Sequence, residues 1–156
     1  MTRTTSTVRL AAIARAALVA GIVLALDQVT KHTIATGIAA GQEKKFLPGV
    51  HLVHVRNTGV AFSLFSGGGT LVLVFTLVAL ALLIVYFVRH PDRHLLWLPT
   101  GMLTGGALGN LIDRISSGAV TDFIKLPHWP AFNVADMSIT LGVLVLLWVL
   151  EARPNR

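Results

Sequence analysis

The chain has 156 residues and a formal net charge of +6; 54% of its residues are hydrophobic, 13% are charged and none is cysteine. Soluble domains carry about 25% charged residues, so this composition, with a mean hydropathy of +0.73, excludes an ordinary water-soluble domain. The lack of cysteine excludes disulfides, thiolate metal sites and cysteine nucleophiles, which leaves carboxylate, hydroxyl and imidazole chemistry.

Four apolar stretches are long enough to be membrane-spanning helices: residues 16–35, 70–88, 95–112 and 134–150. Each has 17 to 20 residues, and a helix of that length crosses or nearly crosses a hydrocarbon layer of ~30 Å. The longer connections, 36–69 and 113–133, are predicted to lie outside. The sequence thus predicts a single all-α integral membrane domain over residues 1–156, with a small extracytoplasmic β-cradle.

The distribution of arginine predicts the orientation of these spans. Arginines gather in the N-terminal segment, in the short loop 89–94 and in the C-terminal tail, which places both termini in the cytoplasm. We therefore interpret the positive net charge as membrane topology and expect no nucleic-acid partner. The asymmetry is reduced by basic residues in the external connections, namely Lys44, Lys45, Arg56, Arg114 and Lys125.

The first apolar stretch allows an alternative, because arginines followed by residues 16–26 also resemble the charged and apolar regions of a secretory signal peptide. Against this, Asp27 and Lys31 continue the stretch at helical spacing and supply an ion pair that a discarded peptide would not need. We therefore interpret residues 16–35 as the first span.

Both external connections contain signals for short strands. In the first, β-branched residues over 50–56 alternate with His51 and His54 and lead into a turn signal at 57–59. In the second, residues 119–124 have strand character, and Trp129 suits the membrane interface. We assign no role to the histidines.

Four acidic residues fall at one level of the predicted topology. Asp27 lies in the outer half of the first span, Asp113 ends the third, Asp122 lies in the second external connection and Asp136 opens the fourth span. A carboxylate against the bilayer is expensive and points to function by default. Three further polar residues share this level, namely Asn57, Arg114 and Asn133. The pattern predicts a polar site at the outer leaflet face.

Some of these charges also have a structural interpretation. Asp27 and Lys31 are four residues apart on one helix and can neutralise each other. Asp113 and Arg114 can simply end a span among lipid headgroups, so their role stays open on residue pattern alone.

Asp136 and Asp122 are the candidates for acid–base chemistry. Asn133 and Asp136 are spaced as a helix cap, and a helix N-terminus favours a charged carboxylate, as a general base requires. Asp122, beside Phe123 and Ile124, would be desolvated, which favours the protonated form. A charged and a neutral carboxylate together can activate water and protonate a carbonyl, as in aspartic hydrolases. We predict Asp136 as the base and Asp122 as the acid.

Other chemistries fit less well. The sequence has no H-E-x-x-H or G-x-S-x-G motif, and its histidines divide between the two predicted membrane faces, so we expect no metal or other cofactor and no serine nucleophile. Gly101, Gly105 and Gly109 are spaced as a stripe for close helix packing. Asn110 follows this stripe, and a buried amide there needs hydrogen-bond partners.

Five motifs occur in order along the chain: D-Q-V-T-K at 27–31, N-T-G-V-A-F-S at 57–63, G-G-A-L-G-N-L-I-D-R at 105–114, G-A-V-T-D-F at 118–123 and F-N-V-A-D at 132–136. Taken together, they resemble the lipoprotein signal peptidases, the signal peptidase II family of bacterial aspartyl proteases. Val60 departs from the pattern, because a smaller alanine is expected there, and we expect it to affect substrate preference and not activity.

The resemblance implies a four-helix enzyme without cofactor that cleaves prolipoproteins before a diacylglyceryl-modified cysteine. It implies a catalytic dyad of Asp122 and Asp136, in agreement with the assignment above. Substrate positioning or support of the dyad is implied for Asn57, Asn110, Arg114 and Asn133, and structural support for Asp27, Lys31 and Asp113. We expect a monomer in the bacterial cytoplasmic membrane, in contact with membrane lipid.

Two other classes of function remain as alternatives. A proton- or ion-coupled transporter would use Asp27, Asp122 and Asp136 as a relay, but polar residues would then be spread through the membrane depth. A non-catalytic scaffold or lipid-binding subunit would give the acidic pair no purpose.

Overall fold

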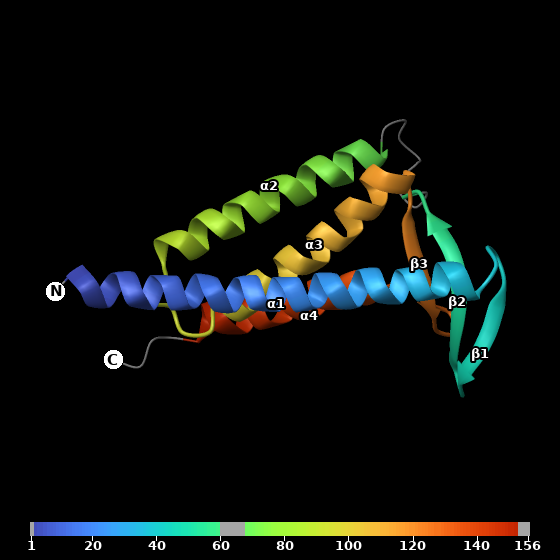
Figure 1. Ribbon diagram of the computed structural model, residues 1–156, viewed down its shortest axis with the longest axis horizontal. Helices are drawn as coiled ribbons and strands as arrows, with labels where there is room; N and C mark the ends of the chain where they lie inside the picture. The colour runs from blue at the N-terminus through green and yellow to red at the C-terminus, as the bar shows by residue number, and fades with distance from the viewer. Residues whose placement is uncertain (1, 60–67, 153–156) are drawn as a thin grey trace.

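The computed structural model describes the backbone of residues 2–59 and 68–152 and the side chains of 6–59 and 74–152. Val60, the departure from the family pattern, lies outside these ranges. The elements in chain order are α1 (Thr2–Gly37), β1 (Glu43–Leu47), β2 (Val50–Asn57), α2 (Gly68–Arg89), α3 (Trp97–Ser117), β3 (Val120–Lys125) and α4 (Val134–Glu151). Figure 1 shows the sheet at one end of the helices and both chain termini at the other.

The ends of two helices differ from the limits of the apolar stretches. α1 begins at Thr2, well before residue 16. The arginines that limit the apolar stretch do not stop a helix, and residues 2–15 contain no proline or glycine. α3 continues past residue 112 to Ser117. It ends at Gly118, whose φ of 73° closes the helix with a bond from its N–H to the Arg114 carbonyl.

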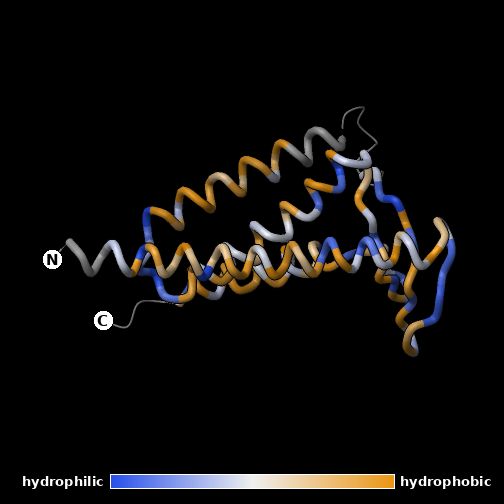
Figure 2. Tube along the Cα trace, in the orientation of Figure 1, coloured by the Kyte–Doolittle hydropathy of each residue, from blue (hydrophilic) through white to orange (hydrophobic). Residues whose placement is uncertain are grey.

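Apolar side chains cover the outside of the helices. Leu18, Phe75 and Leu144 are 65%, 75% and 58% exposed, and Figure 2 shows hydrophobic residues along the helices with hydrophilic residues at both ends. Within the described residues, two stretches are long and apolar enough to cross a membrane, Ser6–Gly37 and Val134–Glu151. The helix-dominated fold with a small sheet is confirmed; membrane crossing by all four helices stays a prediction.

The sheet has three antiparallel strands in the order β1-β2-β3. β3 pairs with β2 in a register that places Val55 opposite Asp122 and Asn57 opposite Val120, with an irregularity between Leu52 and Val55. This register brings the end of β2 next to Asp122, although the two segments are far apart in the chain.

Glycines allow α3 to lie directly against α1 and α4. A Cβ added at Gly105 would lie 2.6 Å from the carbonyl oxygen of Ala20 on α1, and one at Gly106 would lie 2.7 Å from that of Ala135 on α4. A Cβ at Gly109 would collide with the Asp27 carboxylate. The prediction that this stripe serves helix packing is confirmed.

The other side of α3 is loosely packed. α2 diverges from α1 towards the sheet end (Figure 1), and a groove of about 320 Å³ is left between α2, α3 and α4. Its lining is apolar and includes Leu80 and Leu83 of α2, Leu103 and Ala107 of α3, and Val143 and Leu146 of α4.

Candidate active site

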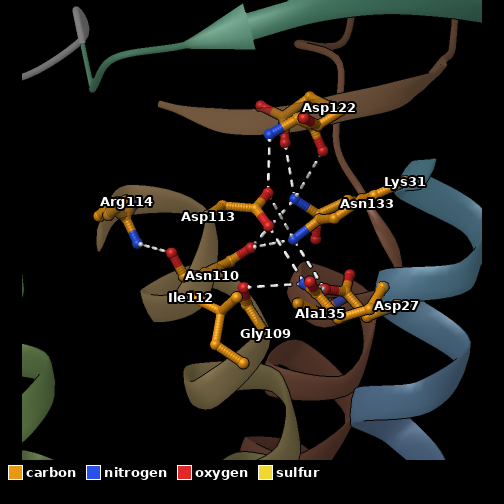
Figure 3. Close-up of polar contacts among 12 residues, drawn as sticks. Asp27, Lys31, Gly109, Asn110, Ile112, Asp113, Arg114, Asp122, Asn133 and Ala135 are labelled. Carbon is orange, nitrogen blue, oxygen red and sulfur yellow. Dashed lines mark hydrogen bonds and ion pairs between the residues drawn. The ribbon is translucent and has the colours of Figure 1, made fainter. Parts of the chain in front are cut away.

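The predicted site residues form one connected polar cluster at the sheet end of the helices (Figure 3). α1 contributes Asp27 and Lys31, α3 contributes Asn110, Asp113 and Arg114, the sheet contributes Asn57 and Asp122, and Asn133 and Asp136 begin α4. All of them are linked by hydrogen bonds or ion pairs. The residues predicted to lie at one level of the topology therefore form one site.

Lys31 is the buried cation of the cluster. Its Nζ lies 2.7 Å from Asp27 Oδ2 and 3.1 Å from Asp113 Oδ2, and it donates a hydrogen bond of 2.9 Å to Asn110 Oδ1. Lys31 and Asp27 are 4% and 0% exposed. Three acceptors match the three ammonium hydrogens, so the charge is buried without an unsatisfied donor.

Asn110 connects this cation to the start of α4. Its Oδ1 accepts hydrogen bonds from Lys31 and from Asn133 Nδ2, at 2.9 and 3.2 Å. Its Nδ2 donates to Asp136 Oδ1 at 2.8 Å. The amide that the sequence predicted to need partners therefore has them on both sides.

Asn133 contacts both candidate catalytic carboxylates. Its Oδ1 accepts from the backbone N–H of Asp136 at 2.9 Å, and its own N–H donates to Asp136 Oδ2 at 3.3 Å, which is the predicted helix cap. Its Nδ2 donates to Asp122 Oδ1 at 2.7 Å. One fully buried side chain thus holds Asp122 and Asp136 on either side of itself.

The two carboxylates have different surroundings. Asp122 is 2% exposed, whereas Asp136 is half-buried. Burial, together with the charge of Asp136, raises the pKa of Asp122 to about 6, although hydrogen bonds from Asn57 and Asn133 and the charge of Lys31 act in the opposite direction. The direction agrees with the prediction that desolvation favours the protonated form of Asp122.

Asn57 reaches Asp122 from the end of β2. Its Nδ2 donates to Asp122 Oδ2 at 2.9 Å, and its Oδ1 accepts from the N–H of Gly59 at 2.8 Å. The second bond fixes which side of the amide faces the carboxylate. Arg114 lies at the edge of the cluster, where it donates a long bond of 3.4 Å to the Asn110 carbonyl and lines a small pocket between α2 and α3.

Sequence reasoning missed Gln28, which lies within the first motif. Its Nε2 donates to Asp113 Oδ1 at 3.1 Å, to the Gly109 carbonyl at 3.2 Å and to Asp27 Oδ2 at 3.3 Å. Its position next to Asp27, inside a motif used for the resemblance, was the available signal. An uncharged side chain in an apolar stretch gave no separate reason to select it.

The histidines of the sheet have local partners. His51 pairs with Glu43, and His54 Nδ1 contacts the Ile38 carbonyl at 2.8 Å. Among the described side chains, the structure contains no group of three or more His, Cys, Asp or Glu residues arranged to hold a metal ion.

Comparison with known proteins agrees with this arrangement. Residues 19–151 match the family model described as signal peptidase (SPase) II. The lipoprotein signal peptidase of Moorella thermoacetica is 44% identical over 138 residues, which cover 85% of this chain and 90% of that protein. The lipoprotein signal peptidase of Halothermothrix orenii is 37% identical over 127 residues, covering 81% and 88%.

A solved structure shares the fold as well. It is described as a bacterial membrane enzyme determined by the in meso method at 1.9 Å resolution, and it is 35% identical with a TM-score of 0.81. The match covers 91% of this chain and 96% of that one.

Proposed function

The chain belongs to the signal peptidase II family of aspartic-type peptidases, and we propose that it removes the signal peptide of prolipoproteins by cleaving before a diacylglyceryl-modified cysteine. Asp122 and Asp136 are its catalytic residues. The observation that carries this assignment is the contact of one buried asparagine, Asn133, with two carboxylates of unequal exposure.

Their unequal surroundings support different roles in peptide hydrolysis. Asp136, the less buried of the two, takes a proton from water as the water oxygen attacks the scissile carbonyl carbon. Burial raises the pKa of Asp122 to about 6, and in its protonated form Asp122 donates a proton to the carbonyl oxygen. When the C–N bond breaks, the proton on Asp136 goes to the leaving amine and a hydroxyl of the tetrahedral intermediate returns a proton to Asp122.

The supporting residues have roles that follow from their contacts. Asn57 and Asn133 orient Asp122, and Asn110 orients Asp136. Arg114, at the edge of the cluster, is placed to contact the substrate backbone. The hydrogen-bond donors of the three asparagines hold the carboxylates in place before substrate arrives, which lowers the reorganisation that the reaction requires.

The location of the site suits a membrane-embedded substrate. A signal peptide is an apolar helix in the bilayer, and its scissile bond is most easily exposed at the interface, where water can reach the dyad. We place the sheet end at the outer face of the cytoplasmic membrane and both termini in the cytoplasm, with the enzyme acting as a monomer. The diacylglyceryl chains stay among the membrane lipids and set the depth of the cleavage site.

The groove between α2, α3 and α4 fits the apolar segment of the signal peptide. Its walls are apolar, and Thr76, Leu80 and Ala107 also line the pocket that contains Arg114. The groove therefore continues along α3 towards the dyad.

The test is cleavage of a diacylglyceryl-modified precursor peptide in liposomes by the wild type, Asp122→Asn and Asp136→Asn, with and without EDTA. Asparagine keeps the shape of each side chain but removes the acid–base group. We expect both variants to be folded and to lose about a thousandfold or more in kcat. EDTA should have no effect.

Asp92→Asn is the matched control, because Asp92 is an exposed carboxylate in the loop between α2 and α3, at the other end of the helices. It should keep wild-type activity. Near-full activity of either dyad variant would show that the assignment is wrong, and Asp113 would then be the next carboxylate to test. Equal cleavage of a precursor without lipid would contradict placement by the acyl chains.

A further inference from the structure

The backbone amide just before each dyad aspartate is bound by a carboxylate from another helix. The N–H of Thr121, which precedes Asp122, donates to Asp113 Oδ2 at 3.0 Å. The N–H of Ala135, which precedes Asp136, donates to Asp27 Oδ1 at 2.8 Å. The backbone of each catalytic residue is therefore anchored to a separate support, β3 to α3 and α4 to α1.

Two side chains of α1 connect these two anchors. Lys31 Nζ bridges Asp27 and Asp113, and Gln28 Nε2 donates to the same two carboxylates and to the Gly109 carbonyl. The distance between the Thr121 and Ala135 amides thus depends on the short segment of α1 that contains Gln28 and Lys31.

Gln28 and Lys31 divide the oxygens of Asp113 between them. Gln28 binds Oδ1, and Lys31 and the Thr121 N–H share Oδ2. A terminal carboxylate torsion is broad and has no strongly preferred angle of its own. Without the bond to Oδ1, the carboxylate can turn away from Thr121 while it keeps its ion pair with Lys31.

We propose that Gln28 is a positioning residue for the dyad: it orients the Asp113 carboxylate onto the Thr121 amide and so fixes where β3 holds Asp122 relative to Asp136. The inference rests on the proposed function, because it takes these two aspartates as the catalytic pair. Gln28 acts through Asp113, and within the described part of the chain its side chain donates to Asp27, Asp113 and the Gly109 carbonyl.

The expected consequence is kinetic. The attacking water and the scissile carbonyl must lie within reach of both carboxylates, and a displacement of about 1 Å in such a site can lower the rate by about a hundredfold. The groove proposed for the substrate does not include Gln28. Loss of Gln28 should therefore lower kcat and leave KM nearly unchanged.

The experiment compares Gln28→Leu with Thr30→Val, using the full chain in liposomes and the lipidated precursor peptide. Leucine is similar in size to glutamine but donates no hydrogen bond. Thr30 is the matched control, because it lies on the same helix and its hydroxyl donates only to carbonyls of α1, those of Leu26 and Asp27. Thermal unfolding and amide hydrogen exchange are measured on the same samples.

We expect Gln28→Leu to lower kcat by about tenfold or more with KM within about twofold of wild type, and Thr30→Val to change neither. Amide exchange should accelerate at Thr121 more than at Ala135, because Asp27 still binds the latter. The inference would be overturned if Gln28→Leu lowered the melting temperature but left kcat and the amide exchange at Thr121 unchanged. That result is expected if Gln28 only stabilises the packing of α1 against α3.

Asp113→Asn tests the same bond from the other side and serves if Gln28→Leu does not fold. Its Oδ1 can still accept from Thr121, but its amide cannot accept from Gln28. Asp113→Asn also removes the charge that pairs with Lys31, so we expect it to be the more affected single variant. The double variant should lose no more kcat than Asp113→Asn alone, because the bond between Gln28 and Asp113 is already absent there. Additive losses would contradict the inference. A wild type that fails to cleave would contradict the proposed function, whereas a wild type that cleaves no faster than Gln28→Leu would contradict this inference alone.

Discussion

The two sides of α3 differ in how closely they pack against their neighbours. Towards α1 and α4, glycines bring backbones into contact, and the polar groups of the site are connected into one network. Towards α2, apolar side chains leave a groove of about 320 Å³. The comparison indicates that rigidity is concentrated where carboxylates must be held in place, and that space is left where an apolar substrate must enter.

The largest effect should come from removing the cation on the tight side. Lys31→Met leaves Asp27 and Asp113 buried without their counter-ion, and breaking a buried pair in this way costs about 3–5 kcal/mol. Leu80→Ala in the groove wall should cost less than about 2 kcal/mol, because the space it leaves joins an existing opening. Unfolding titrations in detergent would measure both; equal losses would contradict the comparison.

The second prediction concerns the glycine contacts. Gly105→Ala places a Cβ against the Ala20 carbonyl and should destabilise the protein by about 1–3 kcal/mol, the range for overpacking. Gly21→Ala is the matched control, because nothing lies within 4 Å of the Cβ it would gain. That control should be neutral or stabilising by up to about 1 kcal/mol, from helix propensity alone. The melting temperatures of the two variants, compared with that of the wild type, measure this difference in stability.

The third prediction is a pH dependence on the polar side. Asp122 acts as the acid and must be protonated, and its pKa without substrate is about 6, so kcat/KM should fall as the pH rises through about 6. The bond from Asn57 lowers this pKa, so Asn57→Ala should raise it and move the falling limb to higher pH. A pH–rate profile of each protein is the measurement. A limb that stays in place or moves to lower pH would show that Asn57 does not act on the acid.

The smallest effect is expected in the groove. Val143→Phe fills part of it and should raise KM for the lipidated precursor by about tenfold, the lower end of the range for a misfit of one methylene in an apolar pocket. Leu144→Phe is the control, because Leu144 is its neighbour on α4 but is exposed and does not line the groove. The kcat of both variants should stay at the wild-type value. A similar KM for the two would argue against substrate binding there.

The fold was largely predictable because the hydropathy of the linear sequence indicates the helices clearly. The apolar stretches predict where helices run, and the positions of Asp27, Asp113, Asp122 and Asp136 within or next to these stretches bring the four residues to one end. Helix limits were less predictable, because hydropathy ends at Arg15 whereas the helix does not.

The contacts within the site could not be predicted in the same way. A motif identifies Asn133 and Asp136 as a helix cap, but it does not indicate that the free side of the same amide binds Asp122. The anchoring of the Thr121 and Ala135 amides was also invisible, because backbone donors carry no signature in the sequence. Gln28 was missed because an uncharged side chain in an apolar stretch does not indicate which groups its amide binds.

The cap at the start of α4 has a consequence for how the enzyme loses activity. Asn133 begins the helix and holds both carboxylates, so fraying of the first turn of α4 and disassembly of the site are one event. Below that turn, α4 has further close contacts with α3, at Ile139 against Gly106 and at Gly142 against Leu103. A detergent or lipid that loosens only this turn would therefore silence the enzyme while its helices stay assembled, and recovery would need only the turn to close again.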